Sequence, residues 1–179
     1  LPFIKSIPFM EKLSINLGGT SGELGTQKSP SVFNTPNDTS IIAPIICYES
    51  IYGEYVTKYS RKGANLFAII TNDGWWDDTP GYKQHLAYAS LRAIENRKWI
   101  VRSANTGISA VINDRGEILE RTTWWEPAVI NAKVRLNSSI TFYAKYGDYI
   151  GRIASLMALL MIALTVVRTL NKTGNRLKG

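Results

Sequence analysis

The most reactive side chain in this sequence is its single cysteine, Cys47, which ends an apolar, β-branched run at residues 41–46. A helical pattern follows at once, so Cys47 is expected at the carboxyl end of a buried strand, beside a helix N-terminus. Ligands bind at this edge of open α/β sheets, and a helix N-terminus with nearby cations stabilises a thiolate. Position alone leaves two interpretations open, because a lone cysteine is more often a small buried apolar side chain.

Further candidate side chains follow Cys47 or lie in a loop after the next apolar run. Glu49 could support the cysteine or could cap the following helix, because the helix dipole stabilises a carboxylate in a first turn. Trp75 and Trp76 could line a pocket, anchor their loop or lie at a membrane surface. One cysteine and one histidine give no ligand cluster, so we expect no metal site and no internal disulfide.

The elements that must position these residues are predicted from hydrophobic patterning. The predicted strands cover residues 41–46, 66–71, 99–103, 108–112, 117–122 and 128–134, with a short one near Val32–Phe33. A helix is expected at 51–62, ended by Gly63, and another at 82–97 with Ala87, Leu91 and Ile94 as its apolar stripe. Two β–α–β units and a hairpin predict an α/β sheet that is parallel at first and antiparallel at its edge.

The net charge of +7 arises mostly at the C-terminal end of the 179 residues. Five basic residues follow Gly151 with no acidic residue among them: Arg152, Arg168, Lys172, Arg176 and Lys178. Without these five, 16 basic and 14 acidic residues remain. This balance argues against a nucleic-acid-binding surface, and the length suffices for one domain with a core.

The last apolar segment has the composition of a membrane helix. Residues 153–167 carry no charge, and residues 149–170 approach the length that crosses a bilayer. The basic flank fits the cytoplasmic side under the positive-inside rule. We expect a transmembrane helix at 149–170, a basic cytoplasmic tail at 171–179 and a globular domain outside the cytoplasm. A buried core helix is the alternative, because the uncharged part is short for a span.

Four motifs occur in the order found in nitrilase-like domains: ICYES at 46–50, TNDGWW at 71–76, LRAIEN at 91–96 and SANTGIS at 103–109. The Cys47-Tyr48-Glu49 triplet, the Tyr-Gly-Asp stretch at 146–148 and the trailing apolar helix narrow the resemblance. From about Gly18 to its end, the chain resembles the C-terminal part of the apolipoprotein N-acyltransferases, bacterial membrane enzymes that complete lipoprotein acylation.

The resemblance implies an α/β fold, a nitrilase-like αββα sandwich of which residues 1–148 form the C-terminal part. It places this domain on the periplasmic side of the bacterial inner membrane. It implies that Cys47 takes a fatty acyl chain from a phospholipid as a thioester, which the α-amine of a diacylglyceryl-cysteine lipoprotein then accepts. The implied partners are the phospholipid donor, the lipoprotein acceptor and the membrane, with no cofactor and with the enzyme as a monomer.

The same resemblance assigns roles around the nucleophile. Tyr48 and Glu49 are implied to support Cys47, and Trp75 to be the aromatic residue of the following active-site loop. Trp76, beside it, is a further candidate for contact with the substrate. Family members use a Glu–Lys–Cys triad whose Glu and Lys precede the cysteine.

The triad Glu and Lys have no counterpart at the family's spacing in this sequence. Lys5 and Glu11 stand at the wrong spacing and are expected to be surface charges. We therefore expect the triad partners, and the larger group of membrane helices that family members carry, to be encoded before Leu1.

Several remaining residues are given structural interpretations. His85 could pair with the cysteine, but family members do not rely on it, so it is expected on a helix surface. Asn105 and Gly107 are expected to set a strand-end turn. Trp124 and Trp125 could face lipid or pack on the sheet edge.

Three functions compete. The first is N-acyl transfer to a lipoprotein. The second is a membrane-tethered amidase of the nitrilase superfamily, in which water resolves the thioester. The third is a membrane-anchored module that keeps the fold without the triad. An upstream Lys and Glu would exclude this third function.

Overall fold

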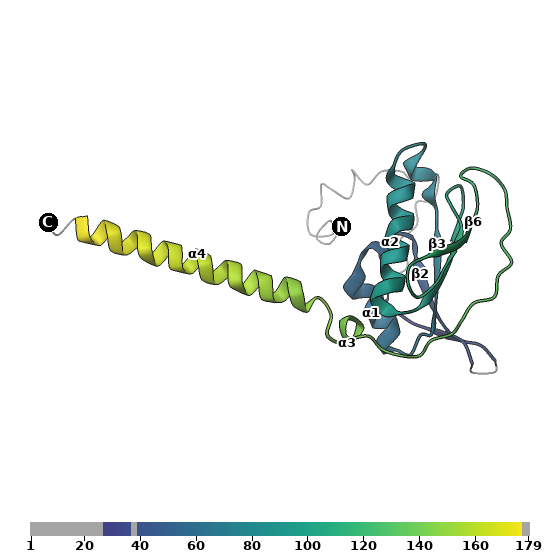
Figure 1. Ribbon diagram of the computed structural model, residues 1–179, viewed down its shortest axis with the longest axis horizontal. Coiled ribbons are helices and arrows are strands. Elements are labelled where there is room, and N and C mark those ends of the chain that lie inside the picture. Colours follow the sequence, from purple (N-terminus) through teal and green to yellow (C-terminus); the bar gives the residue numbers. More distant parts are fainter. Residues whose placement is uncertain (1–26, 37–38, 177–179) are drawn as a thin grey trace.

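The computed structural model describes residues 27–36 and 39–176, and Lys5, Glu11 and residues 177–179 lie outside these ranges. The described strands form one sheet (Figure 1), in the order β1-β2-β3-β4-β5-β6. The strands are β1 Phe33–Asn34, β2 Ile41–Ile46, β3 Leu66–Thr71, β4 Trp99–Ala104, β5 Ala110–Ile112 and β6 Ile118–Arg121. The helices are the 3-10 turns η3 Cys47–Ile51 and η4 Asp73–Trp76, and α1 Gly53–Arg61, α2 Gly81–Asn96, α3 Phe142–Tyr146 and α4 Tyr149–Arg176.

The sheet is parallel in its centre and antiparallel at both edges. β2, β3 and β4 run parallel, with Ile45 opposite Ile69 and Ile69 opposite Arg102. β5 and β6 return antiparallel beyond β4, and β1 pairs antiparallel with β2. The predicted topology is confirmed. It brings the residues that follow β2, β3 and β4 together at the carboxyl ends of these strands.

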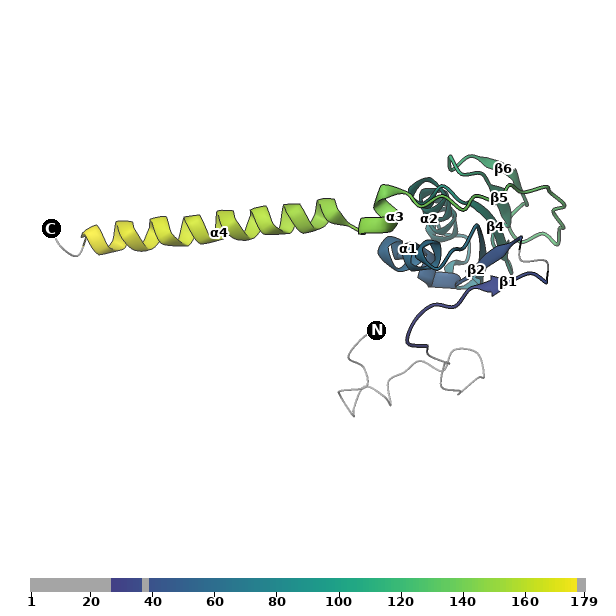
Figure 2. The ribbon, with the colours of Figure 1, turned by 90° about the horizontal axis from the view of Figure 1, so that it is seen from below.

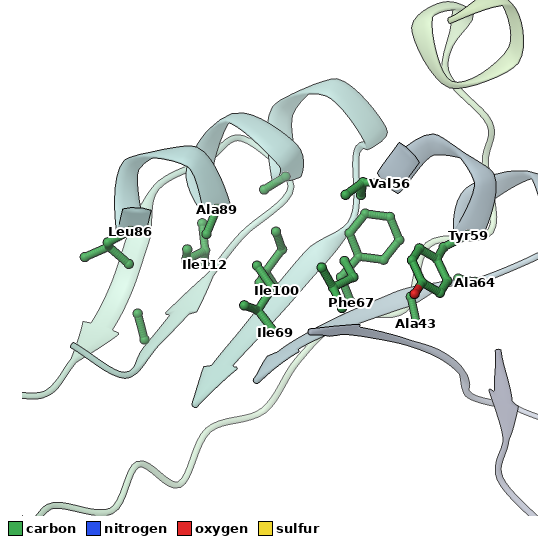
Figure 3. Packing of buried hydrophobic residues seen from close by; sticks show 13 residues of the cluster. Ala43, Val56, Tyr59, Ala64, Phe67, Ile69, Leu86, Ala89, Ile100 and Ile112 are labelled. Carbon is green, nitrogen blue, oxygen red and sulfur yellow. The ribbon is translucent and has the colours of Figure 1, made fainter. Parts of the chain in front are cut away.

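The core lies between this sheet and two helices on one of its faces. Figures 1 and 2 show α1 and α2 side by side on that face. Alternate strand residues such as Phe67, Ile69 and Ile100 point toward the helices and are buried, as Figure 3 shows. Tyr59 from α1 and Ala89 from α2 close the layer above them.

The predicted apolar stripe of the second helix is wrong. Leu91 and Ile94 are 41% and 42% exposed. The buried face of α2 carries Tyr82, His85, Leu86, Ala89, Arg92, Ala93 and Asn96. Alanines let this helix approach the sheet closely, and the polar residues on the buried face have hydrogen-bond partners there, so hydrophobicity alone misplaces the face.

The strand predicted at 128–134 is also wrong, because this stretch pairs with no described strand. It runs irregularly on the side of the sheet opposite α1 and α2 (Figure 2). Ile130, Ala132 and Val134 are half-buried and alternate with exposed neighbours. Together with Ala68 and Ile70 of β3, Ile130 and Ala132 line a hollow on this face. The alternation that predicted a strand thus reflects contact with a sheet face, without a hydrogen-bonded ladder.

The irregular segment between β6 and α3 is fixed to the body through Lys98. This residue is fully buried, and its Nζ donates to the backbone carbonyls of Asn137 and Ser139, the latter at 2.5 Å. The backbone N–H of Asn137 also donates to the backbone carbonyl of Asn65 at 3.1 Å. One buried ammonium therefore connects the start of β4 with the chain that leads to α3.

Burial lowers the pKa of Lys98 to about 8 from its ordinary 10.5. The unfolded chain then binds more protons between pH 8 and 10.5, so stability is expected to rise with pH through this window. We expect the unfolding free energy to increase by roughly 1–2 kcal/mol between pH 7.5 and pH 10, and this increase to be missing in Lys98→Met. Urea titrations in detergent at the two pH values measure the unfolding free energy. An equal change with pH in the parent and in Lys98→Met would contradict the expectation.

The last helix projects away from the domain (Figures 1 and 2). Its first part, Tyr149–Thr169, has 21 residues with a mean hydropathy of 2.2, and none of its most apolar window is buried. Length and composition make it a candidate membrane span. The helix continues to Arg176, beyond the predicted end at residue 170.

The junction before α4 is held by charges and by backbone geometry. Arg152 pairs with Glu54 of α1, and Arg61 donates to the carbonyl of Ala144 at 2.6 Å. Gly147 adopts a φ of +73°, which a residue without a Cβ reaches at little cost. These contacts attach the start of the candidate span to α1, the helix that follows the Cys47 turn.

Candidate active site

Cys47 lies at the end of β2, where the chain enters η3, and it is half-buried. Its φ of +50° is in the left-handed region, which costs a non-glycine residue about 1–3 kcal/mol. Such strain persists only where surrounding contacts impose it. The predicted strand end therefore presents the thiol on a strained turn.

Glu49 supplies contacts that hold this turn. Its Oε2 accepts the backbone N–H of Ile46 at 2.9 Å, and its Oε1 accepts the hydroxyl of Tyr55 at 3.1 Å. The Tyr59 hydroxyl lies 3.5 Å from Oε2 and donates to the carbonyl of Pro44 at 2.9 Å. Burial, more than the nearby Glu49 charge, raises the pKa of Tyr59 and keeps this hydroxyl a donor. These contacts fit the capping interpretation of Glu49, and its support of the cysteine stays a prediction.

A buried ionic cluster lies beneath the cysteine, formed by Asp73, His85 and Arg102. Asp73 Oδ2 accepts from Arg102 at 2.6 Å, and Asp73 Oδ1 lies 3.0 Å from Nδ1 of His85. Burial alone would raise the pKa of Asp73, but the hydrogen bonds and charges of His85 and Arg102 outweigh burial and lower it. Asp73 is therefore held as a carboxylate within the protein interior.

Two hydrogen-bonded connections join this cluster to Cys47. Thr71, the last residue of β3, has its hydroxyl 3.3 Å from Cys47 Sγ and 3.1 Å from Asp73 Oδ1. On the other side, His85 Nε2 lies 3.2 Å from the Cys47 carbonyl oxygen and 2.9 Å from the Ser50 hydroxyl. The Ser50 hydroxyl donates to the same carbonyl at 2.8 Å. The cluster thus contacts both the sulfur side and the backbone of the strained residue.

The expected surface position of His85 is wrong, because this residue is 3% exposed. Its side of α2 faces the edge of the sheet where Cys47 and Asp73 lie. One signal in the sequence could have indicated the cluster: Arg102 is in phase with Ile100 on its strand and must therefore point into the core. A buried arginine needs a carboxylate partner, and Asp73 follows the neighbouring strand.

Gly107 makes room for the Asp73 carboxylate. A Cβ on Gly107 would overlap Asp73 Oδ2 and would lie 2.5 Å from Asp73 Cβ. The backbone N–H of Asn105 donates to the carbonyl of Thr71 at 3.0 Å, which connects the end of β4 to the end of β3. The SANTGIS motif thus forms a strand-end turn that packs against the ionic cluster.

Aromatic side chains gather beside the Cys47 turn. Tyr48 stacks on Trp76, with ring centroids 6.3 Å apart and an interplanar angle of 26°, and its ring also lies 6.2 Å from that of His85. Trp75 is 59% exposed. Of the two tryptophans predicted to contact substrate, Trp76 is therefore the one that packs against the residue next to the cysteine.

The second tryptophan pair packs against the start of α2. Trp124 stacks on Tyr82 at a centroid distance of 5.5 Å. The backbone N–H of Trp125 donates to the carbonyl of Thr106 at 2.9 Å, so the loop lies beside the turn that contacts Asp73.

Within residues 27–36 and 39–176, no group of three or more His, Cys, Asp or Glu side chains could hold a metal ion.

The model of the carbon-nitrogen hydrolase family matches residues 6–143 of this chain. The chain belongs to the carbon-nitrogen hydrolase family. Among curated relatives, an apolipoprotein N-acyltransferase of Chlorobaculum tepidum is 34% identical over 170 residues, which cover 94% of this chain and 32% of the relative. Another, of Geobacter metallireducens, is 37% identical over 150 residues, which cover 83% of this chain and 27% of the relative. The chain spans about a third of the length of these relatives.

Solved structures of carbon-nitrogen hydrolases share the fold. A carbon-nitrogen hydrolase from Helicobacter pylori G27 has a TM-score of 0.50 at 14% identity, covering 56% of this chain and 41% of that one. A variant of an amidase from Nesterenkonia sp. AN1, with acrylamide added at its active-site cysteine, has a TM-score of 0.50 at 19% identity. The match covers 73% of this chain and 50% of the amidase chain. The predicted nitrilase-like fold is confirmed, and the described residues supply one sheet and one helix layer of it.

Proposed function

We propose that this chain carries the cysteine side of the active site of an apolipoprotein N-acyltransferase. The observation that carries the proposal is the strained turn at Cys47, at the carboxyl edge of the sheet. The relatives that share 34% and 37% identity with the chain bear that enzyme's name. A candidate membrane span joined to the same domain fits a lipid substrate.

The proposed reaction has two halves at one sulfur. The Cys47 thiol gives its proton to the general base, the thiolate attacks the acyl ester of a phospholipid, the ester C–O bond breaks as a thioester forms, and the lysophospholipid alkoxide leaves with the proton from the base. The α-amine of a diacylglyceryl-cysteine lipoprotein then attacks the thioester, the C–S bond breaks as an amide forms, and the proton that the amine loses passes through the base to the thiolate. Each tetrahedral intermediate needs hydrogen-bond donors, which the backbone after Cys47 and a lysine would supply.

The roles proposed for other residues follow the resemblance and their positions. Glu49 supports the nucleophile by fixing the turn that presents it, and Tyr48 covers the turn by stacking on Trp76. Trp75 and Trp76 contact the acyl substrate. The triad Glu and Lys, which the resemblance requires, are proposed to be encoded before Leu1.

The location proposed is the bacterial inner membrane, with the domain at 1–148 on the periplasmic side. The span at 149–170 would be followed by a cytoplasmic basic tail at 171–179. The basic residues beyond the span favour this orientation under the positive-inside rule. A monomer fits one active site placed beside one membrane helix.

The test uses the complete protein, including the residues encoded before Leu1, in vesicles of phospholipid with labelled acyl chains. A diacylated lipopeptide with a free α-amine is the acceptor, and the same lipopeptide with an acetylated amine is the control. We expect labelled acyl transfer to the free amine by the parent protein and none by Cys47→Ser.

Each competing function predicts its own product in this reaction. Release of labelled fatty acid with an unmodified lipopeptide would favour the membrane-tethered amidase, in keeping with the hydrolytic family name. No labelled product in either form would favour a module without catalysis.

A further inference from the structure

We propose that Thr71 is a hydrogen-bond donor to the Cys47 thiolate, and that Asp73, Arg102 and His85 hold it in that role. The inference rests on the proposed function, because it names a new residue for the same nucleophile. The Thr71 hydroxyl lies between two acceptors, Cys47 Sγ at 3.3 Å and Asp73 Oδ1 at 3.1 Å. A hydroxyl carries one proton, so it can donate to only one of them at a time.

The protonation state of the sulfur decides between these acceptors. While the thiol is protonated, its S–H can donate to the Thr71 oxygen, and the hydroxyl proton then goes to Asp73. When the sulfur becomes a thiolate, it is a strong acceptor and the same hydroxyl can turn toward it. Thr71 can therefore satisfy both states of the nucleophile without any movement of the backbone.

The ionic cluster makes this switch possible by occupying the carboxylate. Asp73 already accepts from Arg102 at 2.6 Å and faces the His85 ring at 3.0 Å, so it does not depend on the Thr71 proton. The arginine also offsets the negative charge of Asp73, which would otherwise disfavour a second anion nearby. A carboxylate without these partners would compete with the thiolate for the hydroxyl.

The cluster also acts on the backbone of the nucleophile. His85 Nε2 lies 3.2 Å from the carbonyl oxygen of Cys47, and the Ser50 hydroxyl donates to that oxygen at 2.8 Å. His85 is therefore a positioning residue, which links the strained turn to the carboxylate that faces Thr71. Contacts at the sulfur and at the carbonyl fix the direction in which the thiolate points.

The test measures the rate of iodoacetamide alkylation of the peptide containing Cys47, as a function of pH, in the complete protein in detergent. A hydrogen bond to an ionised group is worth enough to shift the half-maximal pH by about one unit. We expect Thr71→Val to move that pH upward by about one unit, and Thr71→Ser to stay near the parent.

Thr57→Val is the matched control, since Thr57 is fully buried and hydrogen-bonded on α1 but has no contact with the sulfur. It is expected to leave the pH of half-maximal alkylation unchanged. Equal profiles for Thr71→Val and the parent would overturn the inference, as would an equal shift in Thr57→Val. Alkylation does not require acyl transfer, so a Thr71-dependent profile without any acylated product would refute the proposed function and leave this inference standing.

Discussion

Asp73→Asn is expected to lower the free energy of unfolding by about 3–5 kcal/mol, the cost of removing one partner of a buried ion pair. Arg102 has no exposed side-chain surface, and its Nη2 donates to Asp73 at 2.6 Å. An amide cannot compensate the guanidinium charge, which would stay buried without its counter-ion. Urea unfolding of the detergent-solubilised chain, followed by tryptophan fluorescence, measures the loss.

The double variant Asp73→Asn with Arg102→Met is the control for this expectation. Removing both charges leaves no unpaired ion, so the double variant is expected to recover part of the loss. A loss below about 1 kcal/mol in Asp73→Asn would show that the pair is not buried as described.

The same pair gives the protein an acid sensitivity with a defined sign. The pKa of Asp73 is lowered in the folded state from its ordinary 3.8, so its stabilisation is present above that value and lost as the pH falls below it. Asp73→Asn is therefore expected to show a flatter decline in stability below about pH 4.

Gly107→Ala is expected to destabilise the chain by roughly 1–3 kcal/mol, the usual cost of overpacking a filled site. The added methyl group would overlap Asp73 Oδ2, so the carboxylate must move away from Arg102 and His85. Unfolding in urea measures the loss of stability. Alkylation of Cys47 is expected to slow at neutral pH, because the displaced carboxylate no longer leaves the Thr71 hydroxyl free for the thiolate.

Asn105→Ala is the matched control in the same turn. The Asn105 side chain is exposed and makes one long hydrogen bond, at 3.4 Å to Asn72. We expect it to change stability by less than about 0.5 kcal/mol. Equal stability of Gly107→Ala and the parent would contradict the close approach of Gly107 to Asp73.

The position of the cysteine could be predicted from sequence because it depends on local pattern and topology. The strands β2 and β3 are short apolar runs rich in β-branched residues, β4 begins as one, and parallel strands place their carboxyl ends at one end of the sheet. Cys47, Asp73 and Asn105 each follow or end such a run, so their shared edge follows from connectivity alone. The strained φ of Cys47 has no comparable signal in the residues.

The ionic cluster could not be predicted in the same way. His85 lies 12 residues from Asp73, and Arg102 lies 29 residues from it. The phase of Arg102 on its strand indicates a buried cation that needs a carboxylate, but hydrophobic periodicity does not indicate that His85 joins this pair. Hydrophobic patterning therefore favours Leu91 and Ile94 as the buried face of this helix and leaves His85 on another face.

The role of the segment after β6 also depended on tertiary contacts. Its alternation at 128–134 resembles a strand, but this stretch lies against a sheet face, and the chain after it is held by the Lys98 contacts to the carbonyls of Asn137 and Ser139. A lysine in a sequence is normally a surface residue, so its burial gives no advance signal.

Mass analysis of the peptide containing Cys47 shows whether this cysteine carries the acyl chain. The complete protein is incubated with phospholipid vesicles in the absence of acceptor, then digested and measured before and after treatment with neutral hydroxylamine. We expect a mass gain of one fatty acyl chain on Cys47, removed by hydroxylamine and absent in Cys47→Ser. An unmodified Cys47 peptide, in a preparation that acylates the lipopeptide in a parallel reaction, would contradict it.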